Sequence, residues 1–436
     1  MRRLSFLKLF LLASLLISSN LLAQSNEEVY QGFQFNFFPP GARSMAMGGA
    51  FIGLADDATA AYSNPAGMVI LTKPEVSAVG KFTEYTTLRA ANWDSFYTGT
   101  LTEFSDGSIA DFGFASVVIP AGKFSFGISM TNFMNYQESF VLETRPIPGT
   151  IWAYRPAVGE MDLKGYYFSA SAAARLSDVF SVGVTVNYTL LNITTTTSLH
   201  DINWADYTDV SGAIINEAYV DDSGSGIGFT AGILITPNPK ISIGAVYSYN
   251  PKIDYVQGFW VGGSRTTGTF LSDITLTLDI PDRFGAGIAF RPFDELVIIA
   301  DVVMTQYSQT TNNGVATYSD SDLGIYRGDD ISTLYETDDT TEIHAGAEYA
   351  LMAGKTPIFL RAGFFTNPDH RPQYKGSDLG ELLRWNLVDY SDQIKETEIG
   401  ITFGIGTVIN SKLQIDGAYV ISDSINQGIV SIVYHF

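Results

Sequence analysis

Apolar and polar residues alternate with a period of two along most of the chain after residue 73. This pattern predicts β-strands, because successive side chains of a strand point to opposite faces of a sheet. Turn-forming residues divide the pattern into segments. The segments are 75–89, 109–119, 124–141, 163–176, 179–199, 226–235, 241–256, 271–290, 296–309, 341–351, 357–366, 395–408, 413–421 and 428–436. The sequence therefore predicts an all-β fold with fourteen strands.

The connections between these segments alternate between short turns and mostly longer loops. Six short turns, such as 120–123 and 410–412, are separated by seven loops, among them 310–340 and 367–394. Outer-membrane β-barrels have short periplasmic turns and longer extracellular loops. The order thus predicts an antiparallel transmembrane β-barrel with both termini in the periplasm. A secreted soluble β-protein is the alternative that composition alone leaves open.

The first 23 residues are typical of a secretory signal peptide. Arg2, Arg3 and Lys8 flank or precede an apolar run over 9–17, and Ala23 is a small residue suited to cleavage. After this signal no run of about 18 apolar residues is present, so the sequence predicts no membrane-spanning helix. The signal and the predicted barrel together indicate an outer membrane of the Gram-negative type.

Composition narrows the classes of function. The chain is 46% hydrophobic and 13% aromatic, which excludes a disordered protein. It has no cysteine, which excludes a disulfide scaffold and a cysteine-ligated metal site. Its 46 acidic and 25 basic residues give a net charge of −21, which argues against nucleic acid as a partner. The expected partners are neutral, apolar or cationic.

Residues 24–73 do not alternate and are rich in small residues. Residues 55–62 predict one or two short helical turns, which the turn signal Asn64-Pro65 ends. A compact segment of this kind before a barrel predicts a plug inside it, and a periplasmic arm is the alternative. We therefore expect a signal peptide (1–23), an N-terminal hatch (24–73) and a transmembrane barrel (74–436).

Two of the predicted strands have additional features. In the strand 124–141 the alternation slips at Asn132 and Phe133, which predicts a β-bulge. The last strand has Tyr434 and Phe436 on one face. A terminal aromatic strand is what the insertion machinery of outer-membrane barrels recognises, and its aromatic residues lie at the interface girdle. We therefore interpret Tyr434 and Phe436 as an insertion signal.

Three stretches resemble the FadL/TodX family of outer-membrane transporters for long-chain fatty acids and aromatic hydrocarbons. Residues 41–67 (GARSMAMGGAFIGLADDATAAYSNPAG) resemble the family's N-terminal hatch, residues 280–308 its mid-barrel hairpin, and residues 346–364 a later pair of strands. The resemblance implies a fourteen-stranded barrel with a hatch. It also implies passive uptake of hydrophobic molecules, without a cofactor, and lateral exit beside a kinked third strand.

The resemblance also assigns candidate site residues. The hatch motif Asn-Pro-Ala falls on Asn64, Pro65 and Ala66. The lateral exit falls on the third strand at Asn132, Phe133 and Met134. Met134 stands where relatives tend to have a glycine, so this chain departs from the family pattern at the kink.

The sequence offers no catalytic pattern. Its four histidines are scattered, and no HExxH, GxSxG or P-loop motif occurs. We expect no enzyme activity, no metal site and no catalytic residue. Acidic residues between Asp320 and Glu342 offer oxygen ligands for cations that bridge lipopolysaccharide, but solvated loop surface is the favoured interpretation.

A secretion-system shuttle or docking protein of the PorV type is the alternative function. It belongs to the same broad superfamily and has a similar N-terminus, so residues 41–67 alone do not separate the two. Residues 280–308 favour transport. The expected partners are hydrophobic small molecules, lipopolysaccharide and outer-membrane lipid, and the barrel-assembly machinery.

Overall fold

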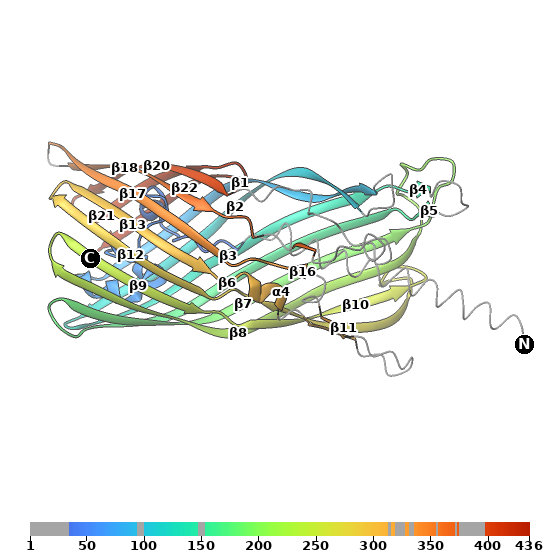
Figure 1. Cartoon of the computed structure of the whole chain (residues 1–436), viewed down its shortest axis with the longest axis horizontal. Helices are drawn as coiled ribbons and strands as arrows, with labels where there is room; N and C mark the ends of the chain where they lie inside the picture. The colour runs from blue at the N-terminus through green and yellow to red at the C-terminus, as the bar shows by residue number, and fades with distance from the viewer. Residues whose placement is uncertain are drawn as a thin grey trace, which may run out of the picture.

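The computed structural model describes residues 35–93, 100–146, 153–312, 315–318, 328–330, 335–354, 356–370, 373–374 and 397–436. Within these residues fourteen antiparallel strands form a closed barrel (Figure 1). The barrel strands are β1 (Glu75–Trp93), β2 (Thr100–Ala121), β3 (Phe124–Leu142), β6 (Ala157–Arg175), β7 (Phe180–His200), β8 (Ile214–Asn238), β9 (Ile241–Tyr249) with β10 (Lys252–Val261), β11 (Thr269–Asp279) with β12 (Arg283–Phe293), β13 (Leu296–Thr305), β17 (Thr340–Ala353), β18 (Thr356–Asn367), β20 (Glu398–Ile409), β21 (Leu413–Ile421) and β22 (Ile425–His435). The predicted fold class is confirmed.

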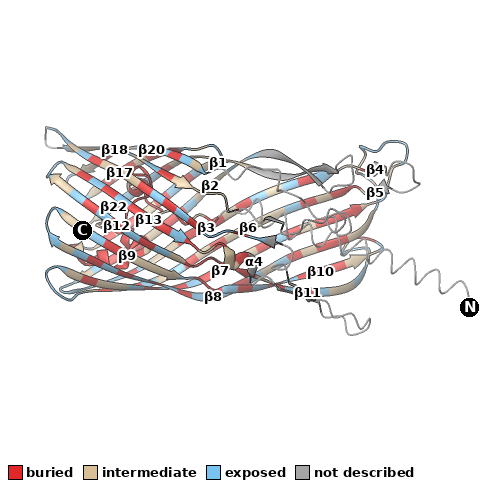
Figure 2. Ribbon diagram, in the orientation of Figure 1, coloured by how far each residue is buried: buried red, intermediate tan, exposed pale blue. Residues whose placement is uncertain are grey.

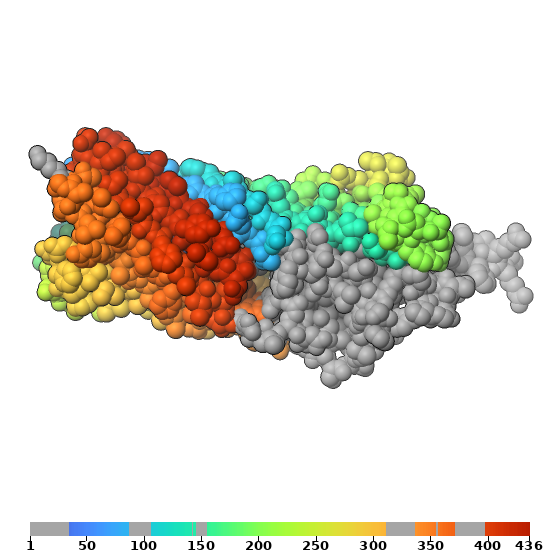
Figure 3. All heavy atoms as spheres, turned by 90° about the horizontal axis from the view of Figure 1, so that it is seen from above, coloured from blue at the N-terminus to red at the C-terminus, as the bar shows by residue number. Residues whose placement is uncertain are grey.

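The barrel closes between its first and last strands. β1 pairs with β22 from Glu75↔His435 to Tyr85↔Ile425, and Figure 3 shows the blue β1 beside the red end of the chain. Because closure leaves no free edge at this joint, the backbone groups of both strands are satisfied within lipid. No helix in the described part of the chain is long and apolar enough to cross a membrane.

The alternation in the sequence corresponds to two different faces of the wall. Along β13, Ile298, Val302 and Met304 point outward and are exposed, whereas Ile299 and Val303 point inward and are buried. Figure 2 shows this change from residue to residue along most strands. An outer face of large apolar side chains suits contact with lipid.

Several strands are longer than the alternation predicts. β8 begins at residue 214 instead of 226, β2 at 100 instead of 109, and β6 at 157 instead of 163. These extensions are at the loop end of the barrel, where a strand faces water and needs no apolar outer face. The hydrophobic pattern therefore ends before the backbone pairing does.

Two predicted strands are each interrupted at a proline. β9 and β10 are separated at Asn250 and Pro251, and β11 and β12 at residues 280–282, which include Pro281. Proline has no N–H group to donate to a sheet. The predicted strand 296–309 also ends early, at Thr305, and a short helix, α4 (Ser308–Asn312), follows.

Residues 35–73, which we call the hatch segment, lie inside the barrel near the end that carries the short turns and the C-terminus (Figure 1). They form α2 (Ala42–Met45), α3 (Ala60–Ser63) and a 3₁₀ helix, η1 (Pro65–Ile70). Most of their side chains are buried, among them Met47, Phe51 and Met68. The first 34 residues, including the predicted signal peptide, lie outside the described residues.

Charged side chains attach the hatch segment to the wall. Arg43 donates from Nε and Nη2 to the carboxylate of Glu348 on β17, both at 2.9 Å. Arg361 on β18 donates to the same carboxylate at 2.6 Å, so two guanidinium groups share one acid. On β13, Asp301 accepts from the backbone N–H groups of Phe51 and Ile52 at 2.6 and 2.8 Å.

Glycines in the wall allow the hatch backbone to come close. A Cβ atom on Gly363 of β18 would collide with the backbone of Met47 and Gly48, and one on Gly232 of β8 would collide with Asn64. The inner wall is therefore shaped to this particular segment.

We expect the substitution Gly363→Val to displace the hatch segment, because the added side chain has no room and overpacking costs about 1–3 kcal/mol. The matched control is Gly428→Val on β22, where a Cβ atom has no neighbour within 4 Å. The measurement is protease cleavage within the hatch in folded protein, identified by its heat-modifiable migration. If the hatch were equally protected from protease in both variants, close packing of the hatch on Gly363 would not be needed to hold it in place.

Candidate functional site

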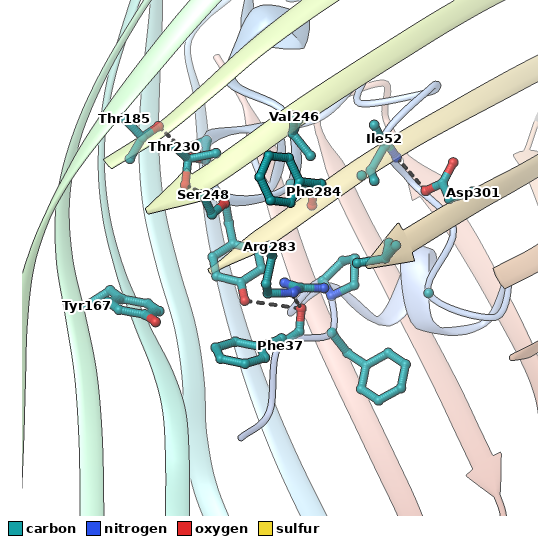
Figure 4. A pocket seen from close by; sticks show the side chains of 18 of the residues that line it. Phe37, Ile52, Tyr167, Thr185, Thr230, Val246, Ser248, Arg283, Phe284 and Asp301 are labelled. Atoms are coloured by element: carbon teal, nitrogen blue, oxygen red, sulfur yellow. Dashed lines mark hydrogen bonds between the residues drawn. The ribbon is translucent and has the colours of Figure 1, made fainter. Parts of the chain in front are cut away.

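A cavity of about 780 Å³, including its open mouth, lies between the hatch segment and the inner wall. We call it the hatch cavity. Its hatch side is largely aromatic and apolar, whereas much of the wall side carries hydroxyl and amide groups. Figure 4 shows its labelled side chains Phe37, Ile52, Tyr167, Thr185, Thr230, Val246, Ser248, Arg283, Phe284 and Asp301.

Arg283 is the central polar group of the hatch cavity (Figure 4). Its Nη1 donates to the backbone oxygen of Phe37 at 2.9 Å, and its guanidinium lies over the Phe37 ring, 4.8 Å from the centroid. Tyr62 donates to the same oxygen at 3.2 Å. The Nε atom of Arg283 is buried and has no partner among the described residues. One donor in an otherwise aromatic region thus remains available.

The proline interruptions place Arg283 at this position. Asp282 accepts from the N–H of Asn250 and the hydroxyl of Tyr247, both at 2.9 Å. The side chain of Asn250 donates to the backbone oxygen of Pro281 at 2.7 Å. The two interrupted strands are therefore held together by Asn250 and Asp282, immediately before Arg283 enters the cavity.

Backbone pairing between β2 and β3 ends inside the wall. The ladder runs from Ala121↔Phe124 to Phe114↔Thr131 and stops there. In the described residues beyond this point, 100–112 of β2 pair with β1 alone and 132–142 of β3 pair with β6 alone. We call this interrupted region between β2 and β3 the seam.

The predicted bulge lies at the start of the seam and is confirmed as a structural feature. Asn132 pairs with Tyr166 and Met134 pairs with Gly165, so Phe133 is the extra residue. Its ring is buried and stacks on Tyr167 with centroids 4.2 Å apart. The Nδ2 atom of Asn132 donates to the backbone oxygen of Met134 at 3.0 Å. Asn132 and Met134 thus support the bulge from both sides.

The hatch segment touches the bulge directly. The N–H of Asn36 donates to the backbone oxygen of Phe133 at 2.8 Å. Phe133 contacts Tyr167, and Tyr167 lines the hatch cavity. The cavity, the bulge and the hatch therefore form one connected unit.

A second cavity, about 1190 Å³ including its open mouth, reaches the seam. We call it the seam cavity. It shares Phe37 and Phe38 with the hatch cavity, and Asp111, Asn132 and Asn135 line it at the seam. Stacked aromatic rings, Phe35 on Phe37 at 5.1 Å and Tyr307 on His370 at 4.0 Å, cover part of its wall. The two cavities are thus neighbours on either side of residues 37 and 38.

The predicted hatch motif lies at the opposite side of the hatch segment. Asn64 is fully buried, and its Nδ2 donates to the backbone oxygens of Ile52 and Ile233 at 2.9 and 3.0 Å. Its Oδ1 accepts from the N–H of Ala66 at 3.2 Å, and Pro65 begins η1. The motif residues therefore contact the wall and the hatch at once, and their functional role stays a prediction.

Tyr434 and Phe436 lie at the turn end of the barrel, away from both cavities. Both rings are exposed on the outer surface, 5.0 Å apart and nearly perpendicular. Phe436 also donates its N–H to the backbone oxygen of Pro74. Their role in insertion stays a prediction.

The buried carboxyl group of Asp57 in the hatch segment is bound by neighbouring residues, and these contacts stabilise the structure of the hatch. Burial raises the pKa of Asp57, although Arg43 and the hydroxyl of Thr59 act in the opposite direction. Its Oδ1 accepts from the Thr59 N–H at 2.8 Å and from the Thr59 hydroxyl at 2.6 Å.

Sequence reasoning did not find Arg283, Tyr167 or the pair Asn250 and Asp282 as cavity residues. In the sequence, residues 280–308 are marked only by their resemblance to the family's mid-barrel hairpin. Proline at 251 and at 281 inside otherwise alternating segments was the available signal, because proline within a strand marks an interruption.

The comparisons with known proteins agree with this geometry. The family model described as outer membrane protein transport protein (OMPP1/FadL/TodX) matches residues 22–373. A FadL homologue of Pseudomonas aeruginosa has a similar structure, with a TM-score of 0.63 and 15% identity, over 92% of this chain and 99% of that one. A comparison with curated protein sequences gives no match.

Two toluene transporters have similar structures. TbuX of Ralstonia pickettii gives a TM-score of 0.55 at 15% identity, over 93% of this chain and 99% of that one. TodX of Pseudomonas putida gives a TM-score of 0.59 at 15% identity, over 92% of this chain and 99% of that one. At this identity the similarity shows the fold. Together with the family match it supports outer-membrane transport and does not favour the secretion-shuttle alternative. The chain belongs to the OMPP1/FadL/TodX family of outer-membrane transport proteins.

Proposed function

We propose that this protein takes up hydrophobic molecules, long-chain fatty acids or monoaromatic hydrocarbons, by passive diffusion and releases them sideways through the seam. The observation that carries the proposal is the pair of cavities that meet at Phe37 and Phe38 and reach from the hatch segment to Asn132 and Asn135. Toluene transporters are among the structures with this fold.

An apolar cavity concentrates a sparingly soluble molecule, which a water-filled pore does not do. Burial of apolar surface contributes roughly 25 cal/mol per Å². The rings of Phe35, Phe37 and Tyr307 supply such surface in the seam cavity. The proposed cycle is downhill and includes no nucleotide, metal or catalytic step.

The seam is the proposed exit. Asn132, Phe133 and Met134, which form the bulge where the seam begins, are the residues proposed to shape this exit. A ligand that leaves between β2 and β3 breaks no ladder hydrogen bond, because none is present beyond Phe114 and Thr131 in the described strands. Where neighbouring strands are fully paired, sideways release would break several ladder bonds within lipid, at a high cost each.

The orientation and the remaining partners are also proposals. We place the short turns and both termini in the periplasm, and the loops outside. Tyr434 and Phe436 are the proposed contact for the barrel-assembly machinery. The proposed contact for lipopolysaccharide is the loop end of the barrel. Asp320 and Asp322, two of the acidic residues noted in the sequence, are outside the described residues.

Orientation is testable with single cysteines, because the chain has none of its own. We expect Ser211→Cys, in the exposed loop between β7 and β8, to react with a membrane-impermeant maleimide on intact cells. Ser411→Cys, in the turn between β20 and β21, should react only after the outer membrane is disrupted. Labelling of residue 411 on intact cells would reverse the proposed orientation.

Deletion of Phe133 tests uptake and exit together. It leaves Asn132 opposite Tyr166 and Met134 opposite Gly165, so β3 becomes regular without a change of register. We expect uptake of radiolabelled oleate or toluene to fall about tenfold or more, since a barrier higher by only ~1.4 kcal/mol has that effect.

The matched control is Phe133→Ala, which also loses the stacking on Tyr167 but keeps the extra residue. It should retain most of the uptake, and both variants should still bind ligand. Equal uptake by the deletion variant and the unaltered protein would remove the seam as the exit. If the unaltered protein takes up neither compound, the transport proposal itself fails.

A further inference from the structure

Three polar side chains meet where the seam begins. Lys81 of β1 and Asp111 of β2 are partners in the strand register, three residues before the last β2–β3 pair at Phe114. From the other side of the seam, Asn135 of β3 donates its Nδ2 to Asp111 Oδ2 at 3.4 Å. A cation, an acid and an amide from three strands thus lie at one point of the wall.

The wall is built to hold this group. β2 has a bulge of its own at Gly113, because Val79 pairs with Phe114 and Gly80 with Phe112. A Cβ atom on Gly113 would collide with Cε of Lys81, so the glycine leaves room for the lysine side chain in its observed position. The bulges at Gly113 and Phe133 therefore flank the start of the seam on its two strands.

Hydrogen-bonding capacity in this group remains unused. Asp111 Oδ1 and Asn135 Oδ1 are buried and have no partner among the described residues. Lys81 is 8% exposed, and within the same part of the chain its ammonium makes no ion pair or hydrogen bond. Buried polar groups are normally satisfied, so these two orphan oxygen atoms call for a donor from a ligand or from water.

The group also lies on the proposed route. Asp111 lines the seam cavity inside the barrel. Together with Lys81 it also lines a shallow groove on the outer wall, whose floor includes the outward-facing Gly80, Gly417 and Gly428. Asp111 thus lies at the inner end of the proposed path between β2 and β3, whereas the outer groove lies over β1, β18, β20, β21 and β22, on the other side of β2 from the seam.

The chemistry of the group selects a particular head group. Lys81 offers donors, whereas Asp111 and Asn135 offer acceptors. The charges of Lys81 and Asp111 cancel, so a carboxylate gains from one and loses to the other. A hydroxyl group both donates and accepts, so it can donate to an orphan oxygen of Asp111 or Asn135 and accept from Lys81 without adding charge.

We propose that Lys81, Asp111 and Asn135 form a polar gate that binds the uncharged hydroxyl head of a hydrophobic ligand at the inner end of the seam. The ligand class comprises long-chain alcohols, phenols and protonated carboxylic acids. This inference rests on the proposed transport function and adds to it a preference among hydrophobic ligands.

The test compares 1-dodecanol with dodecane, which differ only in the hydroxyl, in proteoliposome uptake and in equilibrium binding. The double variant Lys81→Met with Asp111→Leu removes the polar groups and leaves no charge unpaired. We expect it to weaken dodecanol uptake and binding about tenfold, the effect of losing an ordinary hydrogen bond, and to leave dodecane unchanged. Asn135→Leu should give a smaller loss in the same direction.

The matched control is Lys252→Met with Asp279→Leu, which removes a lysine–aspartate pair between β10 and β11, away from the seam. This control should change neither the uptake nor the binding of either ligand. Heat-modifiable migration establishes that each variant is folded. Equal losses for both ligands, or no loss for either, would overturn the gate and leave transport standing. Failure of the unaltered protein to take up both ligands would overturn transport and the gate together.

Discussion

Satisfaction of backbone hydrogen bonds within lipid is the constraint on which this structure depends. A barrel meets it by pairing every strand with two neighbours. The seam is a departure from that rule, and side chains and the hatch replace part of the missing ladder. The hydroxyl of Tyr85 donates to the backbone oxygen of Gln137 across the seam at 2.5 Å, and Asn36 donates to that of Phe133. The wall is therefore closed at the seam by contacts that break more easily than a β-ladder.

The hydrogen bond from Asn36 to Phe133 links the hatch segment to the seam. The strong anchors of the hatch, Arg43 on Glu348 and Asp301 on the backbone of residues 51 and 52, are on the far side from the seam. Its start, near Asn36 and Phe37, contacts the bulge and both cavities. Asn36 and Phe37 therefore connect the hatch to the seam, whereas Phe38 packs on His344 and Phe365 of β17 and β18, next to the anchor of Arg43.

Much of the fold was predictable because the lipid-facing and inward-facing side chains of a transmembrane barrel alternate along each strand, and this alternation is visible in the sequence. The strand order and the alternation of turns and loops follow from local patterns, and so does the bulge, since the change of face at Phe133 is visible over ten residues. The ends of the long strands were not predictable, because water at the loop end accepts polar side chains on both faces.

The cavity residues were less accessible to sequence reasoning. Arg283 acquires its position from Asn250 and Asp282, which are more than thirty residues apart and meet only through strand register. Lys81, Asp111 and Asn135 come from three strands, and nothing in their local sequences marks them as neighbours. They come together at the start of the seam, which the bulges at Gly113 and Phe133 flank on β2 and β3.

A reversible cross-link across the seam tests the central claim most directly. The chain has no cysteine, and the side chains of Asp111 and Asn135 lie within 3.4 Å, so a cysteine at each position can be joined by a short cleavable bismaleimide. The variant without the cross-link is its own reference for the loss of the two polar groups. If hydrophobic molecules leave between β2 and β3, uptake stops when the cross-link forms and returns when it is cleaved. Undiminished uptake with the seam fully cross-linked would contradict the account.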